Sequence, residues 1–159
     1  MIRTSNDQNI EMRRLVRILL VGDEGVGKST LITTFIKEKY INNVQDVVPE
    51  VSIPPEVTPE NVTTHIIDTK WDELQIINEL KKAHVIALVY AIDQPQSFDR
   101  IANHWLPYFR SVGVNIPVIL VGNKIDLRND NPPDNSLEQE IVPIMQEFKV
   151  SFLFYFVKY

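Results

Sequence analysis

The residues with the clearest chemical meaning form a glycine-rich segment that ends in a lysine and two hydroxyl residues. The segment reads Gly22-Asp23-Glu24-Gly25-Val26-Gly27-Lys28-Ser29-Thr30. It fits the phosphate-binding pattern in which two glycines, separated by four residues, precede Lys and then Ser or Thr. In that pattern backbone N–H groups surround the phosphates, the lysine reaches the β- and γ-phosphates, and the hydroxyl ligates Mg²⁺. We therefore expect residues 22–30 to bind nucleotide phosphates, with Lys28 stabilising charge and Ser29 holding the metal.

A second polar segment carries residue types that can recognise a base. It reads Asn123-Lys124-Ile125-Asp126, and it matches the N-K-x-D tetrapeptide of GTP-binding proteins. The Asp126 carboxylate can accept hydrogen bonds from N1–H and the exocyclic amine of guanine, a donor pair that adenine lacks, which disfavours ATP. We expect Asn123 to contact the base and brace the phosphate loop, and the stem of Lys124 to lie over the ring. Together the two segments predict a site for GTP or GDP with Mg²⁺.

The elements around these segments predict a sheet that brings them together. An apolar run at 15–21 precedes the glycines, and a second apolar run at 116–121 precedes the tetrapeptide, as expected for buried parallel strands. Further strands are predicted at 50–57, 62–68, 84–91 and 150–157, and helices at 72–83, 97–110 and 136–149. Ser97 is a candidate N-cap of its helix. This alternation predicts an α/β fold with a mostly parallel sheet, whose ligands bind at the carboxyl ends of the strands.

Composition limits the class of protein. The chain has 159 residues, of which 44% are hydrophobic and 23% charged, and this predicts one globular domain. A net charge of −5 argues against binding to nucleic acid, and the absence of cysteine excludes disulfides and cysteine-based metal sites. Residues 1–14 are polar and are expected to form a flexible leader before a domain at 15–159.

The sequence resembles a known family beyond these two motifs. Residues 16–22, the Asp93…Ser97-Phe98 pattern, Trp105-Leu106-Pro107 and residues 121–127 are similar to the small GTPases of the Ras superfamily. Residues 49–60 and 64–69 resemble the N-terminal GTPase domain of the mitochondrial Rho (Miro) family, as do residues 141–145. The likeness extends over about residues 12 to 149.

The resemblance implies a P-loop NTPase with a Ras-like three-layer fold that hydrolyses GTP to GDP and phosphate. It implies a switch in mitochondrial transport, distribution and morphology, located on the cytosolic face of the mitochondrial outer membrane. Motor adaptors, other effectors, GTPase-activating proteins and exchange factors would be the partners. Asp68 would support Mg²⁺ through water, and Ser52 would be the catalytic metal ligand of the first switch, with Thr58 as the alternative. The chain itself carries no membrane anchor that we can identify.

The sequence departs from the Ras pattern in ways that bear on mechanism. Ras-like proteins carry D-x-x-G-Q at the second switch, whereas this chain reads Asp68-Thr69-Lys70-Trp71-Asp72. Because the water-orienting glutamine is replaced, we predict slow intrinsic hydrolysis. Glu24 stands in the phosphate loop and is expected to point to solvent. The S-A-K segment and the last helix of the family are not found after the run at 150–157. A poorly hydrolysing scaffold and a truncated fragment that binds nucleotide weakly are therefore alternatives.

Overall fold

The architecture is a twisted sheet between layers of helices. The computed structural model describes residues 14–37, 50–69, 73–127, 136–148 and 151–152. The strands are β1 (Leu15–Val21), β2 (Glu50–Ile53), β3 (Thr63–Asp68), β4 (Val85–Ala91), β5 (Val118–Asn123) and β6 (Ser151–Phe152). They form one sheet in the order β2-β3-β1-β4-β5-β6, in which only the β2–β3 pair is antiparallel. This arrangement confirms the predicted α/β fold with a mostly parallel sheet.

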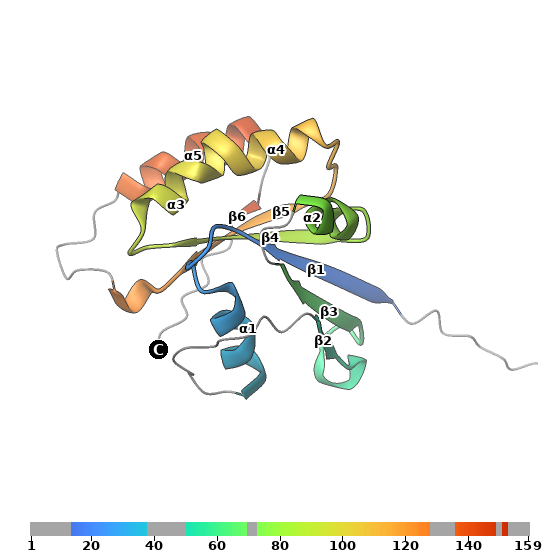
Figure 1. The fold of residues 1–159 in the computed structure, drawn as a ribbon. Helices are drawn as coiled ribbons and strands as arrows, with labels where there is room; N and C mark the ends of the chain where they lie inside the picture. The colour runs from blue at the N-terminus through green and yellow to red at the C-terminus, as the bar shows by residue number, and fades with distance from the viewer. Residues whose placement is uncertain (1–13, 38–49, 70–72, 128–135, 149–150, 153–159) are drawn as a thin grey trace, which may run out of the picture.

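Helices cover both faces of the sheet. The α-helices are α1 (Lys28–Lys37), α2 (Glu73–Leu80), α3 (Pro95–Arg100), α4 (Leu106–Ser111) and α5 (Ser136–Phe148). Short turns are η1 (Pro55–Val57), the π-helical turn η2 (Ile101–Trp105) and η3 (Ile125–Leu127). Figure 1 shows α3, α4 and α5 stacked over one face, with α1 on the opposite face. The three-layer arrangement expected from the Ras resemblance is therefore present.

The core is divided by the sheet into two apolar clusters. One joins β1, β4 and β5 to α2–α5 and contains Trp105 and Tyr90, which are among the largest fully buried side chains. The other packs the opposite face of the strands against α1 through Val26 and Ile32. Burial of these apolar surfaces is the main stabilising contribution, and it fixes the strand ends that carry the functional residues.

Two predicted elements differ from the structure in kind over part of their length. The strand predicted at 50–57 ends at Ile53, and Pro55–Val57 forms a 3₁₀ turn instead, because Pro54 and Pro55 have no N–H to donate to a ladder. The helix predicted at 97–110 begins at Pro95 with Gln94 as its N-cap, and the π-helical turn η2 interrupts it.

Ser97 is consequently not the predicted N-cap. Its buried hydroxyl accepts a hydrogen bond from the Ala91 N–H at 3.0 Å and lies 2.6 Å from the Gln94 carbonyl oxygen. The side chain therefore joins the end of β4 to the first turn of α3, close to the site.

Some predictions fall on residues outside the described ranges. These are the leader before residue 14 and most of the run predicted as a strand at 150–157, of which only Ser151–Phe152 is described. The leader and the rest of that strand remain predictions. Within the ranges that the structure describes, no helix is long and apolar enough to span a membrane.

Candidate functional site

The glycine-rich segment forms the loop between β1 and α1. A Cβ at Gly22 would lie 2.2 Å from the Val89 carbonyl oxygen on β4, a distance that no side chain tolerates. Gly27 has φ +92°, and a Cβ there would lie 2.5 Å from Nδ2 of Asn123. Both positions therefore require glycine, one for close approach to the sheet and the other also for its backbone conformation.

Lys28 lies across this loop. Its Nζ donates hydrogen bonds to the carbonyl oxygens of Gly22 at 2.7 Å and Asp23 at 2.8 Å. Burial lowers the pKa of Lys28, while the charges of Asp68, Asp23 and Glu24 oppose that shift. The ammonium group thus sits over the loop at the start of α1, where the helix N-terminus adds positive potential toward an anion.

Ser29 and Asp68 meet at the carboxyl ends of β1 and β3. The Ser29 hydroxyl donates a hydrogen bond to Oδ2 of Asp68, which is only 2% exposed. The second carboxylate oxygen, Oδ1, is buried without a hydrogen-bond partner among the described residues. Burial raises the pKa of Asp68 despite the hydrogen bond from Ser29 and the charge of Lys28.

These two side chains fit a magnesium ion. Mg²⁺ prefers oxygen ligands, keeps several waters, and is commonly held by one or two protein groups together with substrate phosphates. An unpartnered buried carboxylate oxygen beside a hydroxyl supplies this chemistry, and a divalent cation would offset the cost of burying the charge. Ser29 would be a direct ligand, with Asp68 beside it.

Ser52 does not lie beside this group, and its metal role stays a prediction. The β2–β3 register places Ser52 opposite His65, three residues before Asp68 on β3. At about 3.3 Å per residue, the two positions are roughly 10 Å apart along the strand. The Ser52 hydroxyl instead lies 3.4 Å from Nε2 of His65.

The alternative, Thr58, is also far from the phosphate loop. Its hydroxyl closes the turn between β2 and β3, where it lies 3.0 Å from the Pro55 carbonyl oxygen and accepts from the Val62 N–H at 2.8 Å. This turn leads into Thr63, the first residue of β3, whereas Asp68 is the last residue of that strand. Residues 38–49, which lie between α1 and β2, are outside the described ranges.

The base-recognition segment lies directly beside the phosphate loop. Asn123 is completely buried at the end of β5, and its Nδ2 donates a 2.8 Å hydrogen bond to the Val26 carbonyl oxygen. Lys124 adopts a positive φ of 61°, and its Nζ forms an ion pair with Asp93 at 3.2 Å. Asp126 is exposed in η3. The sheet thus brings two motifs about a hundred residues apart to one rim, as their positions after parallel strands predict.

The remaining loop residues differ in their surroundings. Glu24 and Gly25 are exposed, consistent with the expectation that Glu24 points to solvent, whereas Val26 is fully buried. Thr30 is half-buried in the first turn of α1. Asp23 faces the helical layer, where its carboxylate accepts from Nε1 of Trp105 at 2.9 Å.

Two residues at the site were missed by sequence reasoning. Arg100 and Trp105 both contact the Asp23 carboxylate, the first through an ion pair of 3.0 Å. Arg100 lies at the end of α3 and Trp105 ends η2. The sequence did not predict that both contact Asp23, because residues five apart lie on different faces of an ordinary α-helix.

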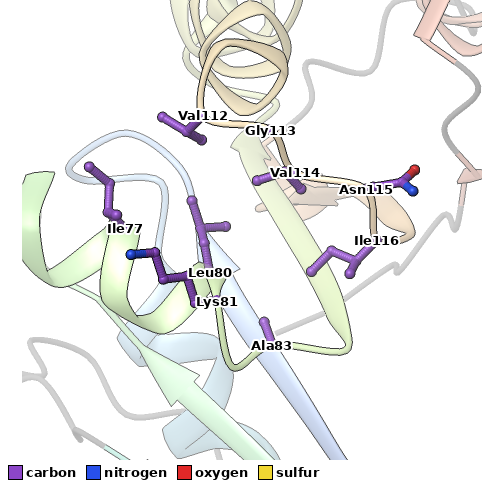
Figure 2. Close-up of a pocket in the computed structure, with 9 residues that line it drawn as sticks. All are labelled: Ile77, Leu80, Lys81, Ala83, Val112, Gly113, Val114, Asn115 and Ile116. Carbon is purple, nitrogen blue, oxygen red and sulfur yellow. The ribbon is translucent and has the colours of Figure 1, made fainter.

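A separate cavity of about 210 Å³ lies away from the phosphate loop. It is bounded by the end of α2 and the segment that joins α4 to β5, and Figure 2 shows Ile77, Leu80 and Ile116 directed into it. Its described lining is largely apolar, with Lys81 as the charged member. The cavity contains none of the predicted nucleotide-binding residues.

Comparisons with known proteins agree with this geometry. The Ras family pattern matches residues 17–153. Mitochondrial Rho GTPase 1 of Cryptococcus neoformans var. neoformans serotype D (strain JEC21 / ATCC MYA-565) is 58% identical over 140 residues, which are 86% of this chain and 20% of the relative. Mitochondrial Rho GTPase 1 of Mycosarcoma maydis is 56% identical over 141 residues, 87% of this chain and 19% of the relative.

A plant relative extends the same likeness. Mitochondrial Rho GTPase 2 of Arabidopsis thaliana is 38% identical over 140 residues, which are 86% of this chain and 22% of the relative. The chain spans about a fifth of the length of these relatives. The matches confirm the resemblance inferred from the sequence motifs.

Proposed function

Because the chain belongs to the Ras family of small GTPases, we propose that it binds GTP and GDP with Mg²⁺ and hydrolyses GTP to GDP and phosphate. The observation that carries this proposal is the 2.8 Å hydrogen bond from Asn123 to the Val26 carbonyl oxygen. It holds the base-recognition segment against the phosphate loop, so that one nucleotide can span both.

Each side chain then has a defined role. Lys28 and the loop N–H groups stabilise charge on the β- and γ-phosphates. Ser29 ligates Mg²⁺ and Asp68 supports it, which neutralises the unpartnered Asp68 oxygen. The exposed Asp126 carboxylate accepts from guanine, and Lys124 and Asn123 complete the base site.

Hydrolysis is proposed to be slow. The glutamine that orients the attacking water in Ras-like proteins is absent, and Asp72 stands at its position outside the described ranges. Thr69 does not replace it, because its buried hydroxyl donates to the Leu20 carbonyl oxygen at 2.9 Å. Because the Thr69 hydroxyl is already bonded, it cannot orient the attacking water. This favours a second candidate function, in which the chain binds GTP, presents itself to partners and scarcely hydrolyses the nucleotide.

A thermal melt with different nucleotides tests the binding proposal first. Saturating ligand at a hundredfold excess over its dissociation constant stabilises the folded state by about 2.7 kcal/mol. A rise in melting temperature with GDP or GTP, but not ATP, is expected in the presence of Mg²⁺. Equal shifts with ATP would contradict guanine specificity, and no shift with any nucleotide would contradict the binding proposal.

Single-turnover hydrolysis separates the two functions. Purified chain loaded with γ-labelled GTP should release phosphate at a slow but measurable rate that depends on Lys28 and Mg²⁺. If the wild-type chain binds GTP but releases phosphate no faster than a Lys28→Ala variant, the result would favour the binding module.

We also infer a mitochondrial setting from the names and similarity of the relatives. The proposed role is a switch in mitochondrial transport, distribution and morphology at the cytosolic face of the outer membrane. Motor adaptors and other effectors would bind the GTP form, and activating and exchange factors would regulate it. The native protein that contains this chain should sediment with mitochondria and be cleaved by protease added to intact organelles. Protection from that protease would contradict the cytosolic orientation.

A further inference from the structure

We infer that Arg100 and Trp105 are positioning residues that hold Asp23 in the phosphate loop, and that the charge of Arg100 compensates the charge of Asp23 and so sets the preference between GTP and GDP. We call this group of three the Asp23 clamp. The inference rests on the proposed nucleotide site and extends it, since neither clamp partner belongs to the phosphate or base motif.

The contacts join the helical layer to the phosphate-binding lysine. Trp105 donates from Nε1 to Oδ1 of Asp23 at 2.9 Å, and Nε of Arg100 pairs with the same oxygen at 3.0 Å. The Asp23 backbone carbonyl accepts from Nζ of Lys28 at 2.8 Å. Trp105 is 2% exposed, so the loop is attached to a rigid part of the core.

The π-helical turn η2 makes this convergence possible. Arg100 and Trp105 are five residues apart, and at 3.6 residues per turn they would point about 140° apart in an α-helix. In η2 the Leu106 N–H bonds to the Ile101 carbonyl oxygen, five residues earlier. This wider turn brings residues five apart toward one face, and such turns occur frequently at functional sites. Both donors consequently reach one carboxylate.

Charge gives the clamp a consequence for nucleotide preference. Asp23 belongs to the phosphate loop, and its own carbonyl oxygen accepts from Nζ of Lys28 at 2.8 Å, so its carboxylate lies near the phosphate-binding lysine. An uncompensated carboxylate in the loop would repel bound phosphates, and GTP carries more negative charge than GDP. Loss of the Arg100 charge should therefore weaken the binding of GTP more than the binding of GDP.

A purely mechanical role for the clamp predicts something different. If Arg100 and Trp105 only hold the loop in place, their loss would lower the stability of the chain and weaken the binding of GTP and of GDP by the same factor. The ratio of the two dissociation constants therefore distinguishes charge compensation from simple anchoring.

The test measures GTP and GDP dissociation constants by competition for the wild-type chain and for Arg100→Met, which keeps most of the apolar stem. We expect binding of GTP to weaken about tenfold and of GDP about threefold, in the range of a charge-assisted contact. The additional substitution Asp23→Asn removes the carboxylate charge and should return the GTP/GDP ratio to the wild-type value.

Arg110→Met is the matched control. Arg110 lies on the same helical layer, but its guanidinium donates to the Glu147 carbonyl oxygen at 2.8 Å and lies 4.0 Å from the ring centroid of Phe148. Its loss should leave the ratio unchanged. An unaltered ratio in Arg100→Met, or a failure of Asp23→Asn to restore it, overturns the inference while the proposed function stands. If the wild-type chain binds neither nucleotide, the proposed function and the inference both fail.

Discussion

Asn123 occupies the space into which a side chain at Gly27 would project. Its Nδ2 lies 2.5 Å from the position of a Cβ on Gly27, and the same nitrogen donates to the Val26 carbonyl oxygen at 2.8 Å. The buried Asn123 amide, which belongs to the base-recognition segment, therefore contacts two consecutive residues of the phosphate loop, Val26 and Gly27. The two halves of the site form a single hydrogen-bonded unit, so a change in one should be felt in the other.

Asn123→Ala should accordingly weaken the loop as well as base binding. The substitution leaves a buried carbonyl without its donor, which costs about 1–3 kcal/mol. The melting temperature of the nucleotide-free chain should fall by about 2–4 °C per kcal/mol, and GDP affinity should fall at least about tenfold. Asn115→Ala, at an exposed asparagine, is the control and should change neither quantity. An unchanged melting temperature in Asn123→Ala would show that the loop does not depend on this amide.

The sequence predicts the fold and most of the site because both depend on local patterns. The glycine spacing before Lys28 and the Asn123–Asp126 tetrapeptide each follow an apolar run, and parallel strands place such motifs at one rim. The exposure of Glu24 followed from electrostatics alone.

Other features of the site are not encoded by local patterns. Ser52 has a suitable hydroxyl, but its distance from Asp68 is set by strand register, which depends on the turn at 54–62. Arg100 and Trp105 were missed because a π-helical turn changes which side chains share a face. In both cases the sequence gives the residue type but not the direction in which the side chain points.

Serine substitutions at positions 29 and 52 test which of the two hydroxyls holds the metal. Ser29→Ala removes the hydroxyl that bonds Asp68, so the Mg²⁺ dependence of GTP binding should be lost. Ser52→Ala removes a hydroxyl that faces His65 and should leave that dependence within about twofold of wild type. Titration of GTP binding against Mg²⁺ measures both. A comparable loss in Ser52→Ala would restore Ser52 as a ligand and require β2 to move.

The Asp68 carboxylate is expected to lower the stability of the nucleotide-free chain and to support metal binding. Burial raises its pKa above the ordinary value of 3.8, so the folded nucleotide-free chain retains the proton to higher pH than the unfolded chain. The free energy of unfolding therefore decreases as pH rises from about 3.8 through the raised pKa, and stays low above it. Asp68→Asn should raise the melting temperature at pH 7 without nucleotide, yet weaken Mg²⁺-dependent GTP binding more than about tenfold. Destabilisation at pH 7 would show that the buried carboxylate is compensated without a metal.

Glu79 provides a pH dependence of opposite sign. The hydrogen bond from Lys82 is the largest influence on its pKa and lowers it, a second hydrogen bond from Arg17 acts the same way, and burial opposes both. This contribution to stability is present above about 4.5 and is lost as pH falls through the lowered pKa. Glu79→Gln should cost about 0.5 kcal/mol at pH 7 and nothing below the lowered pKa, measured by urea unfolding at each pH. A pH-independent cost would mean that Glu79 acts by packing.

Ser97→Ala tests the connection between β4 and α3 that positions the clamp. The buried hydroxyl receives the Ala91 N–H at 3.0 Å, and its removal leaves that donor unsatisfied in the core. We expect a loss of about 1–3 kcal/mol in the free energy of unfolding, read from urea denaturation. Ser111→Ala is the matched control, since its exposed hydroxyl donates to the carbonyl three residues earlier at 2.8 Å, and it should cost less than about 0.5 kcal/mol. Equal costs at the two serines would assign the effect to helix propensity rather than to the buried contact with β4.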